Sequence, residues 1–201
     1  MTGEAIPELD EELLSAYLDG ELSDEQRREF QARLASEPIL RERLVTYQQA
    51  WDRSIAQIKK AVPLAKELGV KISIENVWNN FILSPIEAVK FLDEIGDPIV
   101  GWHFDIGNVL RYGWPEHWIP VLGQRINRIH VKEYSTKKMK DEGVWKGFDC
   151  DLTEGTNNWA AIMKALDSIG YTGWAISEQR GGINPNGLRM LVERMDKIFA
   201  M

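Results

Sequence analysis

The chain has 201 residues, of which 44% are hydrophobic and 27% are charged, and its formal net charge is −7. This composition is typical of a globular protein and excludes overall disorder, while the acidic balance argues against a nucleic-acid-binding protein, which needs a basic face. The single cysteine, Cys150, excludes an intrachain disulfide and a multi-cysteine zinc site. Because no leader-like segment opens the chain and no apolar run is long enough for a membrane span, we expect a cytoplasmic protein.

Charge and tryptophan content divide the chain near residue 46. Residues 1–46 carry 12 acidic and 5 basic side chains, a net charge of −7, whereas residues 47–201 carry 19 of each and all eight tryptophans. We therefore predict two modules, an acidic helical one over residues 1–46 and a neutral one over residues 47–201.

Short helices are predicted within residues 7–46. A first helix stops at Asp19-Gly20, Ser23 and Gln26 form a capping box for a second, and a third begins near Pro38. Their apolar side chains recur at helical spacing: Leu13, Leu14, Tyr17, Leu18, Phe30, Leu34, Leu40 and Leu44. This stripe is too small to fold securely alone, so the module needs something to pack on.

Residues 14–23 and 37–41 resemble the N-terminal segment of bacterial anti-sigma factors. The resemblance implies a protein partner such as a sigma factor. Many relatives carry a zinc site of His and Cys here, but this chain has neither before His103, so its version must be free of metal. The alternative is an acidic helical hairpin that serves packing or solubility.

A long amphipathic helix over residues 47–69 is expected next, ended by Gly69 and kinked or divided at Pro63. Strands and helices then alternate four times. The strands are expected at 71–76, 100–105, 126–133 and 173–178, and the helices at 84–95, 115–122, 158–169 and 187–199. Such regular alternation with short apolar strands predicts an α/β fold with a parallel sheet.

The four strands end in Glu75, Asp105, His130 and Glu178. In a parallel barrel these ends share one face, where ligand sites lie. Three carboxylates and one imidazole suit Mn²⁺, Mg²⁺ or Co²⁺, and Zn²⁺ stays open. Taken singly, each residue has a structural alternative: Asp105 can cap the next turn at Gly107, either glutamate can form a salt bridge, and His130 can be a core histidine.

These strand ends lie within motifs that resemble the C-terminal half of the sugar-phosphate isomerase/epimerase family with a xylose isomerase-like TIM barrel, nearest its L-ribulose/L-xylulose 5-phosphate 3-epimerase and hexulose-phosphate isomerase branch. The motifs are Ile74-Glu75-Asn76, Asp105-Ile106-Gly107-Asn108, His130-Val131-Lys132-Glu133, Glu154-Gly155 with Trp159, Gly170-Tyr171-Thr172-Gly173 and Ser177-Glu178.

The resemblance implies a metal-dependent isomerase or epimerase that acts on a ketose or ketose phosphate through an enediolate. Its metal ligands would be Glu75, Asp105, His130 and Glu178, with Glu75 and Glu178 also serving as the acid–base pair. We assign Asn108 and Lys132 to substrate binding. Ketose 3-epimerases of the superfamily carry a histidine where this chain has Asn108, which leaves the sugar open.

A full barrel needs eight strand–helix units, and this chain supplies four. We therefore predict a parallel half TIM barrel preceded by a small all-α module, and a homodimer that completes the barrel; the alternative is that the N-terminal helices cover the sheet. A regulatory or binding protein with an inactive half barrel is the competing function.

Two further features have open interpretations. Lys137, Lys138 and Lys140 could meet a substrate phosphate or form a solvated run. His103 shares a strand face with Asp105, and it could support the site or pack in the core beside Trp102.

Overall fold

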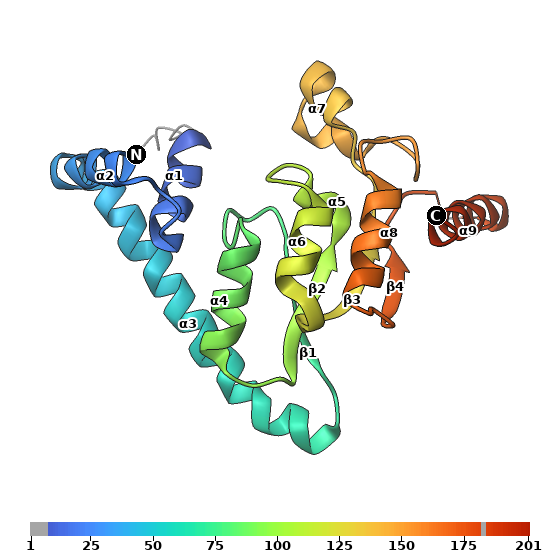
Figure 1. Cartoon of the computed structure of the whole chain (residues 1–201), viewed down its shortest axis with the longest axis horizontal. Helices are drawn as coiled ribbons and strands as arrows, with labels where there is room; N and C mark the ends of the chain where they lie inside the picture. The colour runs from blue at the N-terminus through green and yellow to red at the C-terminus, as the bar shows by residue number, and fades with distance from the viewer. Residues whose placement is uncertain (1–7, 182–183) are drawn as a thin grey trace.

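The computed structural model describes residues 8–181 and 184–201, and it places three helices before a four-stranded parallel sheet (Figure 1). The helices are α1 (Glu8–Asp19), α2 (Asp24–Ser36), α3 (Pro38–Leu68), α4 (Pro85–Ile95), α5 (Ile106–Val109), α6 (Pro115–Leu122), α7 (Thr136–Glu142), α8 (Trp159–Ser168) and α9 (Pro185–Phe199). The strands are β1 (Ile72–Glu75), β2 (Val100–Asp105), β3 (Ile126–Val131) and β4 (Trp174–Ser177). Within these ranges no helix is both long and apolar enough to cross a membrane.

The strands lie in the order β1-β2-β3-β4, and each neighbouring pair is parallel, which confirms the predicted α/β fold. Helices α4, α6 and α8 lie side by side along one face of the sheet (Figure 1). Fully buried side chains such as Trp102, Phe104 and Ile129 fill the space between. Among the described residues, β1 and β4 each have a strand neighbour on one side, so the sheet has two open edges.

The opposite face of the sheet carries the polar side chains. Residues in register on neighbouring strands point to the same face, and the register aligns Glu75 with His103, His103 with Arg128 and Arg128 with Trp174. Two residues further along the strands, on the same face, Asp105 is aligned with His130 and His130 with Ile176. We call this face the concave face.

The N-terminal helices form a second apolar cluster. Its buried side chains are Leu14, Leu22, Phe30 and Leu40, and the predicted partners at positions 13, 17, 18, 34 and 44 pack against them. The second half of α3, with Trp51 and Ile55, joins the main core instead. The boundary expected after residue 46 falls inside α3, so the division into two modules stays a prediction.

Of the two outcomes expected at Pro63, a kink or a division, the division is not observed: helix α3 runs on to Leu68 and its left-handed cap at Gly69. Pro63 lies on the exposed side of the helix, where water can solvate the carbonyl that loses its amide partner. The connection between β3 and α8 contains α7 and a short 3₁₀ segment over Val144–Phe148.

Candidate metal centre and active site

The four predicted ligands meet at the carboxyl ends of the strands. Glu75 ends β1, Asp105 ends β2, His130 lies in β3, and Glu178 directly follows β4. One potential ligand atom from each lies within 4.8 Å of those of the other three. The structure therefore brings together all four residues, which are spread over more than 100 positions of the sequence.

His130 is at the centre of the cluster. Its Nδ1 atom lies 3.0 Å from a Glu75 oxygen, 3.4 Å from a Glu178 oxygen and 3.5 Å from a carboxylate oxygen of Asp105. Asp105 is fully buried, whereas the Glu178 side chain is 48% exposed. The cluster is therefore anchored in the sheet and open to solvent on the side of β4.

Asp105 performs two roles at once. One carboxylate oxygen caps α5 by accepting the backbone N–H of Asn108 at 2.8 Å, while the other faces His130 and Lys132. The expected cap is thus present, although the bonded amide is that of Asn108 and not of Gly107. Capping and a place in the cluster are not alternatives for this residue.

Lys132 inserts its ammonium group into the cluster. The Nζ atom lies 2.7 Å from Glu178 and 3.3 Å from both Asp105 and the side-chain oxygen of Asn108. Asn108 also donates to the backbone carbonyl of Asn76. Both residues assigned to substrate binding therefore lie beside the four predicted ligands.

Gly107 leaves space for the Lys132 side chain, because a Cβ at position 107 would lie 2.8 Å from the lysine Cγ.

Three carboxylates in one place shift each other's ionisation. Burial raises the pKa of Glu75, and the nearby Asp105 and Glu178 carboxylates add to this, although His130 opposes it. Burial likewise raises the pKa of Asp105. The hydrogen bond to Asp105 raises the pKa of His130. Burial opposes ionisation of Glu178, but its hydrogen bonds and the Lys132 charge outweigh this and lower its pKa.

The donor set fits a divalent cation. Ligand atoms held about 2.0–2.6 Å from one ion lie roughly 3–3.7 Å apart around it, and the three His130 distances fall in this range. Three carboxylates and one lysine also leave negative charge in excess, which a cation would neutralise. Glu75, Asp105, His130 and Glu178 are therefore the residues that could hold a metal ion.

Neighbouring polar residues hold the strand ends in place. The Asn76 side chain accepts the backbone N–H of Asp105 and donates to the carbonyl of the same residue, at 2.9 and 2.8 Å. Buried Glu133 accepts the indole N–H of Trp159 and the backbone amides of Thr153 and Asn157. Glu133 thus fixes the long connection after β3, close to the cluster.

Other features flagged in the sequence lie outside the cluster. Lys137 pairs with Asp141 on the exposed surface of α7, and Lys138 donates to the backbone carbonyl of Asp149. Sequence reasoning missed an aromatic group of Trp78, Tyr134, Trp145 and Phe148, whose rings contact one another. Phe148 lies below the Lys132 ammonium, at 4.9 Å. Trp78 comes from the connection after β1 and the other three from the connection between β3 and α8, and they share no regular spacing that could reveal them.

This fold and site define the class of protein. The chain belongs to the xylose isomerase-like TIM barrel family, whose model matches residues 20–198. The predicted membership in the xylose isomerase-like TIM barrel family is therefore confirmed, while the branch within it stays a prediction. Because the match begins at residue 20, it includes most of the segment likened to anti-sigma factors, and that likeness stays a prediction.

Two curated relatives, a dehydratase and an epimerase, show sequence similarity to this chain. The chain is 26% identical over 153 residues to inosose dehydratase of Clostridium perfringens, covering 70% of this chain and 51% of the relative. It is 30% identical over 98 residues to 2-epi-5-epi-valiolone 7-phosphate 2-epimerase of an Actinoplanes species, covering 48% and 34%. The chain thus spans about half the length of the curated relatives it matches.

Solved structures share the fold. D-psicose 3-epimerase from Clostridium cellulolyticum H10 aligns with a TM-score of 0.61 at 19% identity, over 74% of this chain and 55% of that one. The zinc-bound IOLI protein aligns with a TM-score of 0.57 at 16% identity, over 77% and 58%. Identities this low establish the fold alone.

Proposed function

We propose that this protein is a divalent-metal-dependent isomerase or epimerase of a ketose or ketose phosphate. The observation that carries the proposal is the convergence of Glu75, Asp105, His130 and Glu178 at the carboxyl ends of four parallel strands. The names of its relatives, an epimerase of a sugar-like phosphate and a dehydratase of inosose, support the same class of substrate.

The acid–base work falls to Glu75 and Glu178. When bound, a divalent ion supplies Lewis-acid polarisation of the substrate carbonyl. One glutamate removes the proton from the carbon next to the carbonyl, and the other returns a proton to the resulting enediolate. Burial raises the pKa of Glu75, whereas the hydrogen bond from Lys132 and its charge lower the pKa of Glu178, so the two carboxylates lie in different environments. Lys132 and Asn108 hold the substrate oxygens beside them.

Turnover with and without metal tests this function. The purified chain is stripped with a chelator, reloaded with Mn²⁺, Mg²⁺, Co²⁺ or Zn²⁺, and incubated in D₂O with a panel of ketoses, ketose phosphates and inosose. We expect metal-dependent deuterium incorporation next to the carbonyl of at least one substrate, measured by NMR. Failure of every metal and substrate pair to exchange would contradict the proposal.

The partner that completes the barrel is a second copy of the chain. Trp174 and Ile176, on the concave face, are 78% and 39% exposed, although the aligned positions of a closed barrel are interior. Strand β4 of one copy pairs with β1 of the other, so that both open edges are satisfied. The relatives' length, about twice the matched segment, supports eight strands as the complete unit.

A second candidate function is protein binding by the N-terminal helices. A groove of about 710 Å³ lies between α1, α3 and the connection after β1, and its mixed lining includes apolar Leu14, Ile39 and Phe81. It contains none of the four predicted ligands. Together with the acidic charge of residues 1–46, this groove favours a basic protein partner such as a sigma factor. Co-purification of such a partner from the native host would support this role.

A further inference from the structure

A hollow of about 390 Å³ adjoins the four-residue centre. Its lining comes from the connection between β3 and α8 and from Arg180, which lies two residues after Glu178. Phe148 is a wall of this hollow, and its ring lies 4.9 Å from the Lys132 ammonium nitrogen, which itself lies 2.7 Å from Glu178. Small-molecule sites enclose about 300–1,000 Å³, so the hollow is large enough for part of a small ligand.

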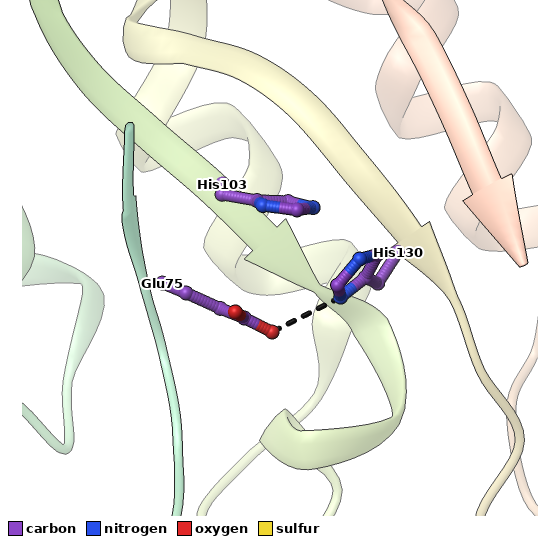
Figure 2. Close-up of side chains that lie close together, drawn as sticks. All are labelled: Glu75, His103 and His130. Atoms are coloured by element: carbon purple, nitrogen blue, oxygen red, sulfur yellow. Dashed lines mark hydrogen bonds and ion pairs between the residues drawn. The ribbon is translucent and has the colours of Figure 1, made fainter. Parts of the chain in front are cut away.

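Side chains fill the other side of the centre, toward the amino ends of the strands. Figure 2 shows Glu75, His103 and His130 coming from three strands toward one another, and the two imidazole ring centroids are 3.9 Å apart. The Glu178 side chain, in contrast, is 48% exposed. A substrate held at the centre therefore extends outward past Glu178, toward the hollow.

The charged groups of the hollow suit hydroxyl groups better than a phosphate. Among the described residues, its lining contains three carboxylates, Asp149, Asp151 and Glu154, and two cations. Both cations have partners, because Lys138 donates to the backbone carbonyl of Asp149 and Arg180 pairs with the Asp149 carboxylate. A phosphate would have to displace these contacts against the repulsion of the carboxylates, whereas a hydroxyl group donates to a carboxylate oxygen.

Two of these carboxylates are held in place and still open to a ligand. Arg194 of α9 lies 2.5 Å from Asp151 and 3.0 Å from Glu154, through different guanidinium nitrogens. The two carboxylate side chains remain 48% and 59% exposed. Because a carboxylate has about four acceptor sites, each of them can also accept a hydrogen bond from a bound molecule.

We propose that this hollow binds the non-reacting end of the substrate, and that this end carries free hydroxyl groups and no phosphate. The substrate class of the proposed function, on which this rests, then narrows from a ketose or ketose phosphate to an unphosphorylated ketose. Asp151 and Glu154 accept hydrogen bonds from its hydroxyl groups, and Phe148 provides the apolar wall beside its carbon chain.

Paired substrates test this in the unmodified protein. The metal-loaded chain is given each ketose of the panel and the same ketose phosphorylated at the end furthest from the carbonyl. We expect kcat/KM to be at least about 10-fold higher for the unphosphorylated member, the order of one hydrogen bond to a charged group. An equal or higher kcat/KM for the phosphate would overturn the role of the hollow and leave the proposed function intact. Absence of exchange in every pair would contradict the proposed function itself.

Matched variants assign the preference to the hollow. Glu154→Gln removes a charge from its lining, and Glu193→Gln makes the same change on the exposed surface of α9. We expect Glu154→Gln to raise KM for the unphosphorylated ketose by about 10-fold with kcat nearly unchanged, since the lost contact binds ground state and transition state alike. Glu193→Gln should change neither value. The same KM in both variants, or a loss confined to kcat, would overturn the proposal.

Discussion

Glu178→Gln is expected to reduce turnover by on the order of 10²–10⁴-fold, the usual contribution of a general acid or base. The amide keeps the shape of the side chain and its contact with Lys132 but loses the basicity. Because the Glu178 side chain is 48% exposed, we expect the fold to be largely spared. Steady-state kinetics on the substrate found in the exchange experiment measures the loss.

Two control variants define what this loss means. Glu193→Gln makes the same change on the exposed surface of α9, and Lys138→Ala removes a cation outside the cluster. Both should retain nearly full turnover. A comparable loss in Lys138→Ala would instead favour the phosphate interpretation of the lysine run, and unchanged turnover in Glu178→Gln would remove Glu178 from the acid–base role. Metal analysis of Glu178→Gln separates loss of basicity from loss of the ion.

The purified chain, 23.0 kDa in mass, should sediment as a dimer. A lone sheet would leave the backbone groups of two edges unpaired and Trp174 in water, and a second copy removes both costs. The N-terminal helices do not supply this cover, since α1 and α2 lie at the opposite side of the molecule from β4 (Figure 1).

A substitution at the proposed contact tests the dimer directly. Trp174→Ser should shift the mass toward the monomer, whereas Trp145→Ser, which removes another exposed tryptophan away from the sheet edge, should not. Analytical ultracentrifugation at micromolar concentration measures both. A compact, stable monomer of the unmodified chain would overturn the dimer proposal.

Much of the site could be predicted because parallel strands place their carboxyl ends at one edge. Each strand was recognisable from its short apolar run, and the residue that ends it followed directly. Asp105 is an example. Its position at the end of a strand predicted its place in the cluster, and the glycine turn after it predicted its role as a helix cap.

The remaining contacts depend on tertiary structure that local patterns do not encode. The Lys132 ammonium reaches the carboxylates because Gly107 leaves space on a neighbouring element. The sequence could not decide between the alternatives for His103, because its neighbours Glu75 and His130 come from two other strands. The sequence did not predict that α3 would continue past Pro63, because the cost of an internal proline depends on solvent exposure and not on helical sequence alone.

Metal content is the most direct test of the central claim that four strand ends form a metal centre. The stripped chain is dialysed against Zn²⁺ or Mn²⁺ beside Asp105→Asn, which keeps the capping oxygen and removes the charge at the buried ligand. We predict one tightly held ion per unmodified chain and much weaker binding in Asp105→Asn. Equal, weak binding by the two proteins would contradict the account.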